Sequence, residues 1–324
     1  MFCLGLDIGY SNMKLALGDL NGSQPHLLLR PAGAAPVDRL PERIGGGTGA
    51  MQVLVEGEPY AAGVSPDRLQ DWNRVLHADY PATASYRALF HAALLLTERD
   101  IVEQVVTGLP VSHYQEASRK AALKAALQGV HQITPKRAVT VQQVQVVPQP
   151  VGGYLDLVWR YDTTVLEQSR VLVLDPGFFS FDWVVIVNGE MRHRSSGTSQ
   201  QATSVLLEEA DRLIQQEHGG RVGRERLESA LRTGQDRIVL YGRQLEIEPY
   251  LRQAAERTVA VALAALREAL RHESEADLVL VTGGGAEFFA PPVRELFPRS
   301  EVIVPPEPVF ANVRGFWWSG QLGG

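Results

Sequence analysis

Short apolar runs and segments with a helical spacing alternate along the chain, separated by turns rich in glycine, proline or asparagine. A short apolar run bounded by turn residues predicts a strand, and apolar residues at intervals of three and four predict a helix. Strands are therefore predicted at residues 2–7, 13–17, 102–106, 144–147, 171–174, 181–187 and 278–281. Helices are predicted at residues 85–99, 114–127, 200–216, 249–272 and 310–319, with two more beginning near Val151 and Glu287. This order is typical of an α/β protein.

Both halves of the chain contain a predicted β-hairpin. Residues 2–17 and 171–187 each form a strand, a tight turn and a second strand, and a further hairpin is predicted around Gly242. A chain of 324 residues with 45% hydrophobic residues is long enough for two domains. Because the run Pro148-Gln149-Pro150 breaks the chain near its middle, we place the first crossing between domains there.

Composition excludes several classes of protein. The net charge of −6 and the pI near 5.8 give no general electrostatic reason to bind nucleic acid directly, or an anionic membrane. A single cysteine, Cys3, excludes an internal disulfide and a thiolate-rich zinc site. We find neither a signal peptide nor an apolar run of the roughly 18 residues needed to span a bilayer. We therefore expect a cytoplasmic protein that does not enter a membrane.

The turn at residues 7–14 carries groups that suit a phosphate and a metal ion. Gly9 lets the backbone bend so that successive N–H groups point at phosphate oxygens. Asp7, at the end of a strand, is suited to holding a hydrated metal ion, and Lys14 is suited to neutralising phosphate charge. The structural alternative is an ordinary hairpin with a turn aspartate and a solvated lysine.

The turn at residues 175–182 has the same design. Asp175 ends a strand, Gly177 follows two residues later, and Ser180 supplies a hydroxyl that can donate to phosphate. The structural alternative is a hairpin stabilised by its own aspartate and serine. Two such turns, one in each half of the chain, favour two halves that hold one ligand.

A third turn consists of Gly283, Gly284 and Gly285 between a predicted strand and a predicted helix. Three consecutive glycines are entropically costly unless the space is needed. They allow a flat or charged ligand to approach the backbone, and the N-terminus of the following helix favours negative charge. A tight crossover without a ligand is the alternative.

Four segments together resemble the nucleotide-binding motifs of bacterial actin-like proteins. Residues 7–14 resemble the phosphate 1 motif, 107–110 the connect 1 motif, 175–182 the phosphate 2 motif and 282–287 the adenosine motif. Residues 311–316 also look like the C-terminal segment of that group. The resemblance covers nearly the whole chain and is to the ParM/StbA plasmid-segregation family, including the ParM-like proteins of PRTRC gene systems.

The resemblance implies a two-domain actin-like (ribonuclease H-like) α/β fold with a nucleotide cleft between the domains. Domain I would comprise residues 1–150 and 301–324, and domain II residues 151–300. ATP, or alternatively GTP, would bind there with Mg²⁺. By position, Asp7 and Asp175 would be catalytic and hold the metal through water. The nucleotide-binding residues would be Gly9, Tyr10, Ser11, Asn12, Lys14, Gly177, Phe178, Phe179, Ser180, Gly283, Gly284 and Gly285.

Hydrolysis needs a group that orients water for in-line attack on the terminal phosphate. Gln149 occupies the position at which ParM-type proteins carry a glutamate and actin a glutamine, so the resemblance makes it the third catalytic residue. A neutral amide orients water without acting as a strong base, and slow turnover is therefore expected. The structural alternative is a turn glutamine between two prolines.

The chain departs from the family at two of these turns. Phe178 and Phe179 stand where most relatives have a glycine and a threonine, and Pro176 removes one backbone donor. Tyr10 stands where many relatives have a serine or threonine. The large aromatic side chains either face the core or alter how the turn handles a nucleotide.

The resemblance implies a slow ATPase that forms nucleotide-dependent filaments for plasmid or DNA segregation, with DNA reached through an adaptor protein. A non-polymerising, nucleotide-gated regulatory protein is the second hypothesis, which the altered second turn favours. A small-molecule kinase of the same superfamily is the third. The kinase would need an aspartate base beside a second substrate pocket, and the sequence identifies none.

Overall fold

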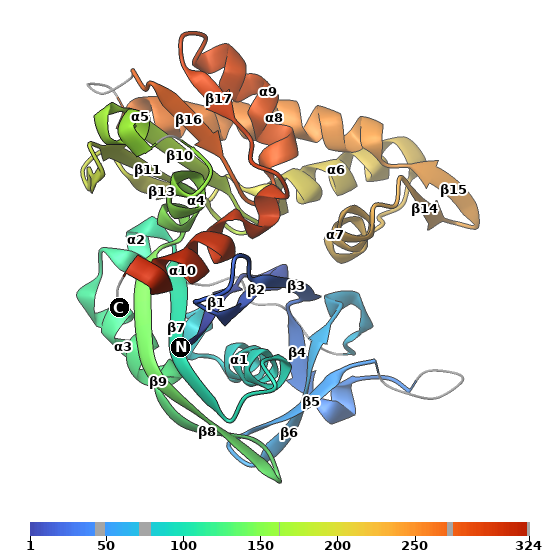
Figure 1. Ribbon diagram of the computed structural model, residues 1–324. Coiled ribbons are helices and arrows are strands. Elements are labelled where there is room, and N and C mark those ends of the chain that lie inside the picture. Colours follow the sequence, from blue (N-terminus) through green and yellow to red (C-terminus); the bar gives the residue numbers. More distant parts are fainter. Residues whose placement is uncertain (43–48, 71–78, 162, 271–274, 323–324) are drawn as a thin grey trace. The chain divides into compact units, whose positions relative to one another are not determined.

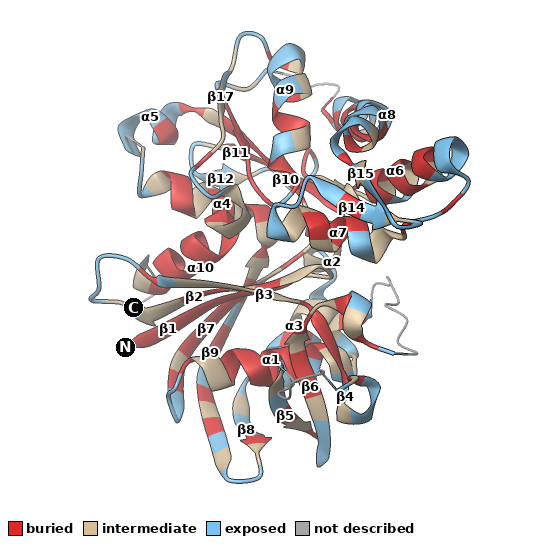
Figure 2. Ribbon diagram, turned by 90° about the vertical axis from the view of Figure 1, so that its right-hand side faces the viewer, coloured by how far each residue is buried: buried red, intermediate tan, exposed pale blue. Residues whose placement is uncertain are grey.

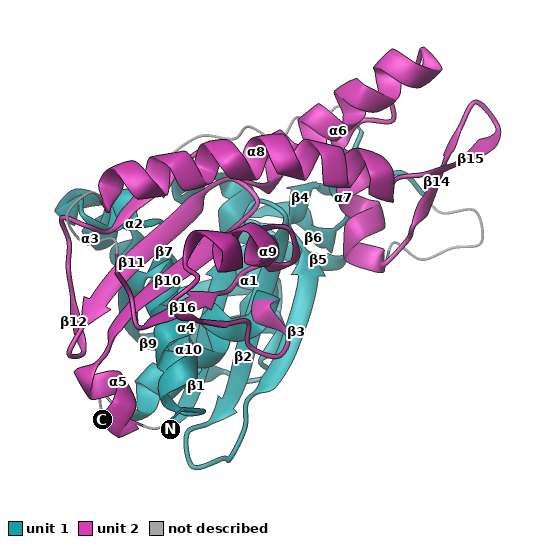
Figure 3. Ribbon diagram, turned by 90° about the horizontal axis from the view of Figure 1, so that it is seen from above, with its two compact units in different colours: residues 1–162, 309–324 teal, residues 163–308 magenta. Residues whose placement is uncertain are grey.

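The computed structural model describes residues 1–42, 49–70, 79–161, 163–270 and 275–322 of the chain. The chain forms two compact units, each of which is described separately below. Unit 1 comprises Met1–Asp162 and Val309–Gly324, and unit 2 comprises Thr163–Pro308 (Figure 3). The chain therefore leaves unit 1 after residue 162 and returns after residue 308, later than the domain boundaries expected from the sequence after residues 150 and 300. The helix that follows residue 148 belongs to unit 1 because it packs against the C-terminal helix of that unit.

Unit 1 is built on a six-stranded sheet with the strand order β3-β2-β1-β7-β9-β8 (Figure 1). The strands are β1 Phe2–Ile8, β2 Asn12–Asp19, β3 His26–Pro31, β7 Ile101–Leu109, β8 Gly129–Thr134 and β9 Arg137–Pro148. A three-stranded sheet contains β4 Gly33–Pro36, β5 Met51–Val55 and β6 Glu58–Val64 in the order β4-β6-β5. The helices are α1 Ala84–Leu96, α2 Val111–Tyr114, α3 Ala117–Leu127, α4 Gln149–Val158 and α10 Ala311–Leu322. Three 3₁₀ turns lie at Val37–Arg39, Pro66–Arg68 and Tyr80–Ala82.

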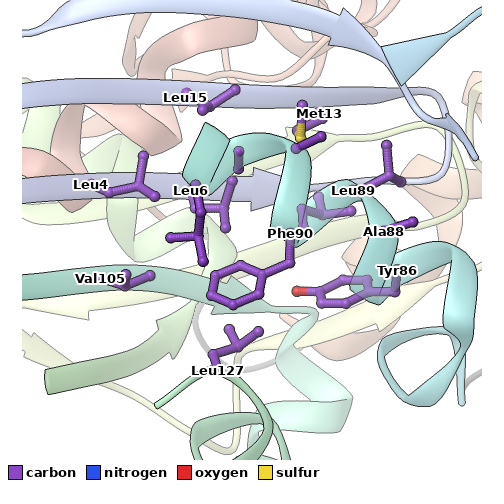
Figure 4. Close-up of a cluster of buried hydrophobic side chains, with 14 of the residues drawn as sticks. Leu4, Leu6, Met13, Leu15, Tyr86, Ala88, Leu89, Phe90, Val105 and Leu127 are labelled. Carbon is purple, nitrogen blue, oxygen red and sulfur yellow. The ribbon is translucent and has the colours of Figure 1, made fainter. Parts of the chain in front are cut away.

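Strand β1 is buried on both faces, because every one of its seven residues is buried (Figure 2). Side chains alternate between the two faces of a strand. Leu4 and Leu6 therefore point to one face, where they pack with Phe90 of α1 in the main core of unit 1 (Figure 4). Cys3 points to the other face, where it packs with α10. Asp7 has the same parity as Cys3, and this alternation directs its side chain to the face that carries α10.

Helices α4 and α10 pack closely because glycines lie at their contact. A Cβ on Gly315 of α10 would lie only 1.8 Å from the carbonyl oxygen of Gly152 of α4. Near this contact, Asp156 of α4 forms a buried ion pair with Arg314, at 2.7 Å between Oδ2 and Nη2. Asn312 Oδ1 also accepts a hydrogen bond from the backbone N–H of Gly153. These contacts fix α4 against the C-terminal helix.

Unit 2 is built on a second sheet, with the strand order β12-β11-β10-β16-β17 and with β13 paired to β11. The strands are β10 Arg170–Pro176, β11 Phe181–Val187, β12 Glu190–Met191, β13 Gly197–Ser199, β16 Leu278–Val281 and β17 Glu301–Ile303. A separate hairpin consists of β14 Arg237–Leu240 and β15 Arg243–Glu246. The helices are α5 Thr163–Gln168, α6 Thr203–His218, α7 Arg224–Thr233, α8 Glu248–Ala269 and α9 Ala286–Leu296. A 3₁₀ turn at Pro308–Phe310 leads back to unit 1.

Local sequence sets the helix ends in unit 2. Helix α6 buries Leu206, Ala210 and Leu213 at helical spacing and ends at Gly219, which has a φ of 71°. Helix α7 ends in the same way at Gly234, with a φ of 68°. Helix α8 begins with proline at its first turn, where a missing N–H costs no hydrogen bond. Helices α6, α8 and α9 cover the sheet and enclose the core of unit 2.

The predicted strands and hairpins are confirmed, and most helices begin and end within a few residues of their predicted limits. The predicted helix at 114–127 is two helices, because Glu116 between them has an extended backbone. Helix α7 and the short strands of the three-stranded sheet were not predicted, because their apolar runs are too brief to stand out. Part of the predicted helix at 249–272 lies outside the described residues. Within the described residues, no helix combines the length and apolarity needed to cross a membrane.

Candidate functional site

The turn between β1 and β2 is closed by its own backbone. The N–H of Gly9 donates to the carbonyl oxygen of Asn12 at 3.0 Å. The carbonyl of Ser11 accepts from Ala32 N, which ties the turn to the chain beyond β3. Asn12 Nδ2 donates to Ser11 Oγ, whereas Asn12 Oδ1 is buried and has no hydrogen-bond partner among the described residues. That acceptor is free to meet a donor from a bound ligand or its water shell.

Asp7 is buried and holds two side chains. Lys14 lies directly opposite it on β2, and Lys14 Nζ contacts Asp7 Oδ2 at 2.7 Å. Gln149, the first residue of α4, donates from Nε2 to Asp7 Oδ1 at 3.0 Å. Three residues selected from the sequence are therefore brought together in unit 1. The lysine charge stabilises the carboxylate, which would otherwise be costly to bury.

Parallel strand pairing brings Gln149 to Asp7. Strand β1 pairs in parallel with β7, and β7 pairs in parallel with β9, so the carboxyl ends of all three strands lie at one edge of the sheet. In open α/β sheets, ligands bind at this edge. Gly108 belongs to β7, the strand between β1 and β9. This residue must be glycine, because a Cβ there would be 2.7 Å from Gln149 Cγ.

The side chain of Tyr10 packs against another aromatic ring. Its ring stacks on Tyr80 with centroids 4.4 Å apart, and Tyr80 meets the edge of Tyr86 at 5.4 Å. Burial, followed by the nearby charge of Asp7, raises the pKa of Tyr86. This row of aromatic rings anchors the turn to α1. It accounts for a tyrosine at position 10.

The turn between β10 and β11 in unit 2 repeats the geometry of the first turn. The N–H of Gly177 donates to the carbonyl oxygen of Ser180 at 2.9 Å, as Gly9 does to Asn12 in unit 1. Asp175, like Asp7, is buried at the end of its strand. The carbonyl of Gly177 accepts from Thr203 Oγ1 at 2.8 Å, which fixes the turn to the start of α6. Phe178 is partly buried and packs against the core of unit 2.

Ser180 donates its hydroxyl to a protein group. Its Oγ lies 2.5 Å from Asp182 Oδ2, and Thr198 Oγ1 lies 2.6 Å from Asp182 Oδ1. Because a hydroxyl has one proton, Ser180 in this arrangement can only accept from a ligand. The donor role predicted for Ser180 is therefore wrong for this conformation. Asp182 was part of the motif in the sequence but had no predicted role, and nothing local to Thr198 pointed to this network.

The three glycines follow β16, which pairs in parallel with β10, so they lie at the same sheet edge as Asp175. A Cβ on Gly283 would be 2.2 Å from Asp175 Oδ1, and one on Gly285 would be 2.8 Å from the carbonyl oxygen of Pro176. A Cβ on Gly284 would meet no atom within 4 Å of the described structure. Gly283 and Gly285 are thus required by packing, whereas Gly284 faces open space.

The residues present fit a magnesium nucleotide. The buried acceptor Asn12 Oδ1 has no protein donor in the described part of the chain, and the backbone at Gly284 leaves room for a flat group. Asp7 and Asp175 supply carboxylate oxygens, the ligand type that Mg²⁺ prefers. Lys14, held by Asp7, places a positive charge at the first turn. Unit 1 thus supplies a carboxylate, a lysine charge and a turn closed by its backbone, and unit 2 supplies a carboxylate and a turn of the same geometry.

Both halves of the chain match models of known protein families. Residues 5–152 match the N-terminal domain of actin-like proteins, and residues 173–295 match the C-terminal region of the archaeal actin homologue described as MreB-like. No curated protein matches the chain.

Solved structures of similar fold cover the whole chain. A crystal structure of Ta0583, an archaeal actin homolog, has a TM-score of 0.80 at 20% identity, over 99% of this chain and 100% of that chain. Its complex with ADP has a TM-score of 0.78 at 20% identity, with coverage of 99% and 100%. A 15-stranded ParM filament from Clostridium botulinum has a TM-score of 0.73 at 16% identity, with coverage of 99% for both chains. These matches confirm the two-domain α/β fold that the sequence predicted.

Proposed function

We propose that this chain, whose two halves match models of actin-like protein families, binds ATP with Mg²⁺, hydrolyses it slowly, and assembles into nucleotide-dependent filaments that segregate plasmid or other DNA. The observation that carries the proposal is the repeated turn. In each unit an aspartate ends a buried strand, and a glycine two residues later closes the hairpin with a hydrogen bond of 2.9 to 3.0 Å. A repeated phosphate-binding turn is what two units that hold one nucleotide would require. GTP remains the alternative nucleotide.

The turns supply the groups for binding. Gly9 to Asn12 and Gly177 to Ser180 would place backbone N–H groups near phosphate oxygens, with Lys14 as the positive charge. Asp7 and Asp175 would hold Mg²⁺ through water, and the metal would neutralise phosphate charge. Asn12 Oδ1 and Ser180 Oγ can accept hydrogen bonds from such water molecules. Gly284 would lie against the nucleoside.

The proposed role of Gln149 is to orient the attacking water. Its Nε2 donates to Asp7 Oδ1, which leaves Oε1 as the only acceptor of that amide. An oriented acceptor aligns water for in-line attack, and most of the catalysis of phosphoryl transfer is such positioning. A neutral amide is not a strong base, so turnover is slow. Gln149→Ala should therefore slow phosphate release and leave nucleotide affinity nearly unchanged.

Filament formation is supported by the fold shared with the ParM filament. An open filament requires two complementary surfaces that join head to tail. The proposed cargo is DNA bound by an adaptor protein, since the net charge of −6 gives no general attraction for nucleic acid.

Light scattering and phosphate release, recorded together after addition of Mg-ATP, test the proposal over a series of protein concentrations. We expect scattering only above a threshold concentration, with hydrolysis rising alongside it. Scattering that does not change, with hydrolysis linear in protein concentration, would contradict filament formation and indicate a non-polymerising enzyme. Nucleotide binding without either response would favour the regulatory protein.

A nucleotide-gated regulatory protein is the second candidate function, and one observation favours it. The Ser180 hydroxyl donates to Asp182, and the phenylalanines that follow Gly177 carry no hydroxyl, so this turn has no side-chain hydroxyl left to donate to a phosphate. That turn is suited to binding more than to hydrolysis. A small-molecule kinase ranks below both, because no aspartate base beside a second substrate pocket has been identified in the described residues.

A further inference from the structure

Helix α10 and Gln149 both border the space over Gly108, and α10 does so through one aromatic ring. Phe316 is fully buried, and its Cζ lies 2.7 Å from the point that a Cβ on Gly108 would occupy. Gln149 Cγ lies at the same distance from that point. The phenyl ring and the aliphatic stem of Gln149 therefore both border the space over the bare backbone of Gly108. This residue of β7 leaves room for both only because it is glycine.

The same ring packs against the first turn of α4. A Cβ on Gly152 would lie 2.6 Å from Phe316 Cε1, and Gly152 is three residues after Gln149. Phe316 thus fills the space between β7 and the turn of α4 that carries the glutamine. A planar ring bounded by backbone on two sides has little freedom to shift, so it defines where the stem of Gln149 can lie.

We propose that Phe316 is a positioning residue for Gln149. The inference rests on the proposed function, in which the amide of Gln149 orients the attacking water. The ring fixes the stem from the side of α10, and Asp7 fixes the amide nitrogen at 3.0 Å. Because the stem and the amide nitrogen of Gln149 are both held, its Oε1 atom has one orientation. The C-terminal helix, which is more than 160 residues away in sequence, therefore sets the geometry of the proposed catalytic group.

The first test substitutes the ring in two backgrounds. Phe316→Leu, and the milder Phe316→Met that nearly conserves volume, should lower kcat for phosphate release about 10- to 100-fold with KM unchanged. In a Gln149→Ala background the same substitutions should have no further effect. The matched control is Trp317→Phe, the next residue of α10, which is also fully buried but donates to the carbonyl of Gly18 on β2 instead. This control should lower stability while kcat stays the same.

The second test does not depend on hydrolysis. The side-chain amide protons of Gln149, identified by NMR from their loss in Gln149→Ala, should be shifted and slowed in exchange by the bond to Asp7. Their chemical shifts and exchange rates should move towards the values of a free amide in Phe316→Met and should be unchanged in Trp317→Phe. Unmoved amide signals in Phe316→Met, or an equal loss of kcat in the Gln149→Ala background, would overturn the inference. Absent hydrolysis in the unmodified protein would instead contradict the proposed function and leave the NMR test decisive.

Discussion

Gly283 and Gly284 are neighbours with opposite structural demands. Gly283 has a φ of 75°, and a Cβ there would overlap Asp175 Oδ1 at 2.2 Å. A Cβ on Gly284 would have no atom of the described structure within 4 Å, and the φ of Gly284 is not in the left-handed region. Only the first glycine is explained by the fold. The second is available to a ligand.

Paired alanine substitutions separate these roles. Gly283→Ala should lower the free energy of unfolding by at least about 1–2 kcal/mol, the cost of the left-handed backbone for a residue with a Cβ, and should displace Asp175. Gly284→Ala should change stability by less than about 0.5 kcal/mol, as at an open site. Urea denaturation measures both. Calorimetric titration with Mg-ATP should then show weaker binding for Gly284→Ala, and unchanged affinity would remove Gly284 from the nucleotide site.

His91 is a buried base in the core of unit 1. Burial lowers its pKa from 6.5 to about 4, opposed by its hydrogen bond to the carbonyl of Leu54 and assisted by the charges of His131 and Arg87. Its Nδ1 lies 2.6 Å from that carbonyl oxygen. The unfolded chain binds a proton near pH 6.5, whereas the folded chain does so only near pH 4. The contribution to stability is therefore complete above pH 6.5 and is lost as the pH falls towards 4.

The expected loss is at most about 3.5 kcal/mol, from roughly 1.4 kcal/mol for each of the 2.5 pH units between the two pKa values. The test compares the free energy of unfolding at pH 7 and pH 4.5 for the unmodified protein and for His91→Gln, which should lose less stability on acidification. His193→Gln, at an exposed histidine, is the control. Carboxylate titrations are common to all three proteins and cancel in the difference. Identical acid sensitivity would show that His91 is not responsible.

At the scale of elements, the α4–α10 pair depends on a buried charge. Arg314 makes two hydrogen bonds to Asp156 Oδ2 and one to Oδ1, at 2.7 to 3.1 Å, and both side chains are almost completely buried. Arg160 approaches the same carboxylate at 3.2 Å from the partly exposed end of α4. Two helices held by glycine contacts and a desolvated ion pair cannot slide past each other easily.

Removing one partner of this ion pair should lower the free energy of unfolding more than removing both partners. Asp156→Asn should lower the free energy of unfolding by about 3–5 kcal/mol, because it leaves Arg314 buried without its counterion. The double variant Asp156→Leu with Arg314→Met should be close to the unmodified protein. Arg252→Ala, which breaks an exposed pair with Glu248 on α8, is the control and should cost less than about 1 kcal/mol. Equal losses for the single and double variants would contradict this account.

At the scale of the whole molecule, each unit has its own apolar core. The main core of unit 1 is formed by β1, β2, β7, β9 and α1, and that of unit 2 by β10, β11, β16, α6 and α8. Units with separate cores can unfold separately unless a shared ligand links them.

Hydrogen exchange followed by mass spectrometry tests that link. Without nucleotide, peptides from β1 and from β10 should report different opening free energies. Saturating Mg-ATP at about 100 times its Kd should raise the opening free energy of both units by about 2.7 kcal/mol. Mg-AMP, which lacks the β- and γ-phosphates, is the control ligand and should protect less. Protection confined to one unit would show that the two turns do not bind one nucleotide.

The sequence by itself determined most of the long strands and helices and the positions of the three turns. Strands β1, β10 and β16 are short apolar runs, and Gly9, Gly177 and Gly283 follow them within two residues, so local pattern and glycine chemistry were sufficient. The repeat of an aspartate and a glycine two residues later in each half was likewise visible along the chain. These features depend on residues that are close in sequence.

Only the tertiary structure decided which groups meet. Lys14 binds Asp7 across a hairpin, and parallel strand pairing brings Gln149 to the same carboxylate. The hydroxyl of Ser180 donates to Asp182, although the sequence suggested that it would donate to a ligand. Phe316 and Gln149 both border the space over Gly108, which brings together three elements that no local pattern relates. The bond between Ser180 and Asp182 is local, but the other partners are set by strand register and helix packing, which a local sequence pattern does not reveal. For that reason the turns could be predicted from the sequence, whereas their hydrogen-bond partners could not.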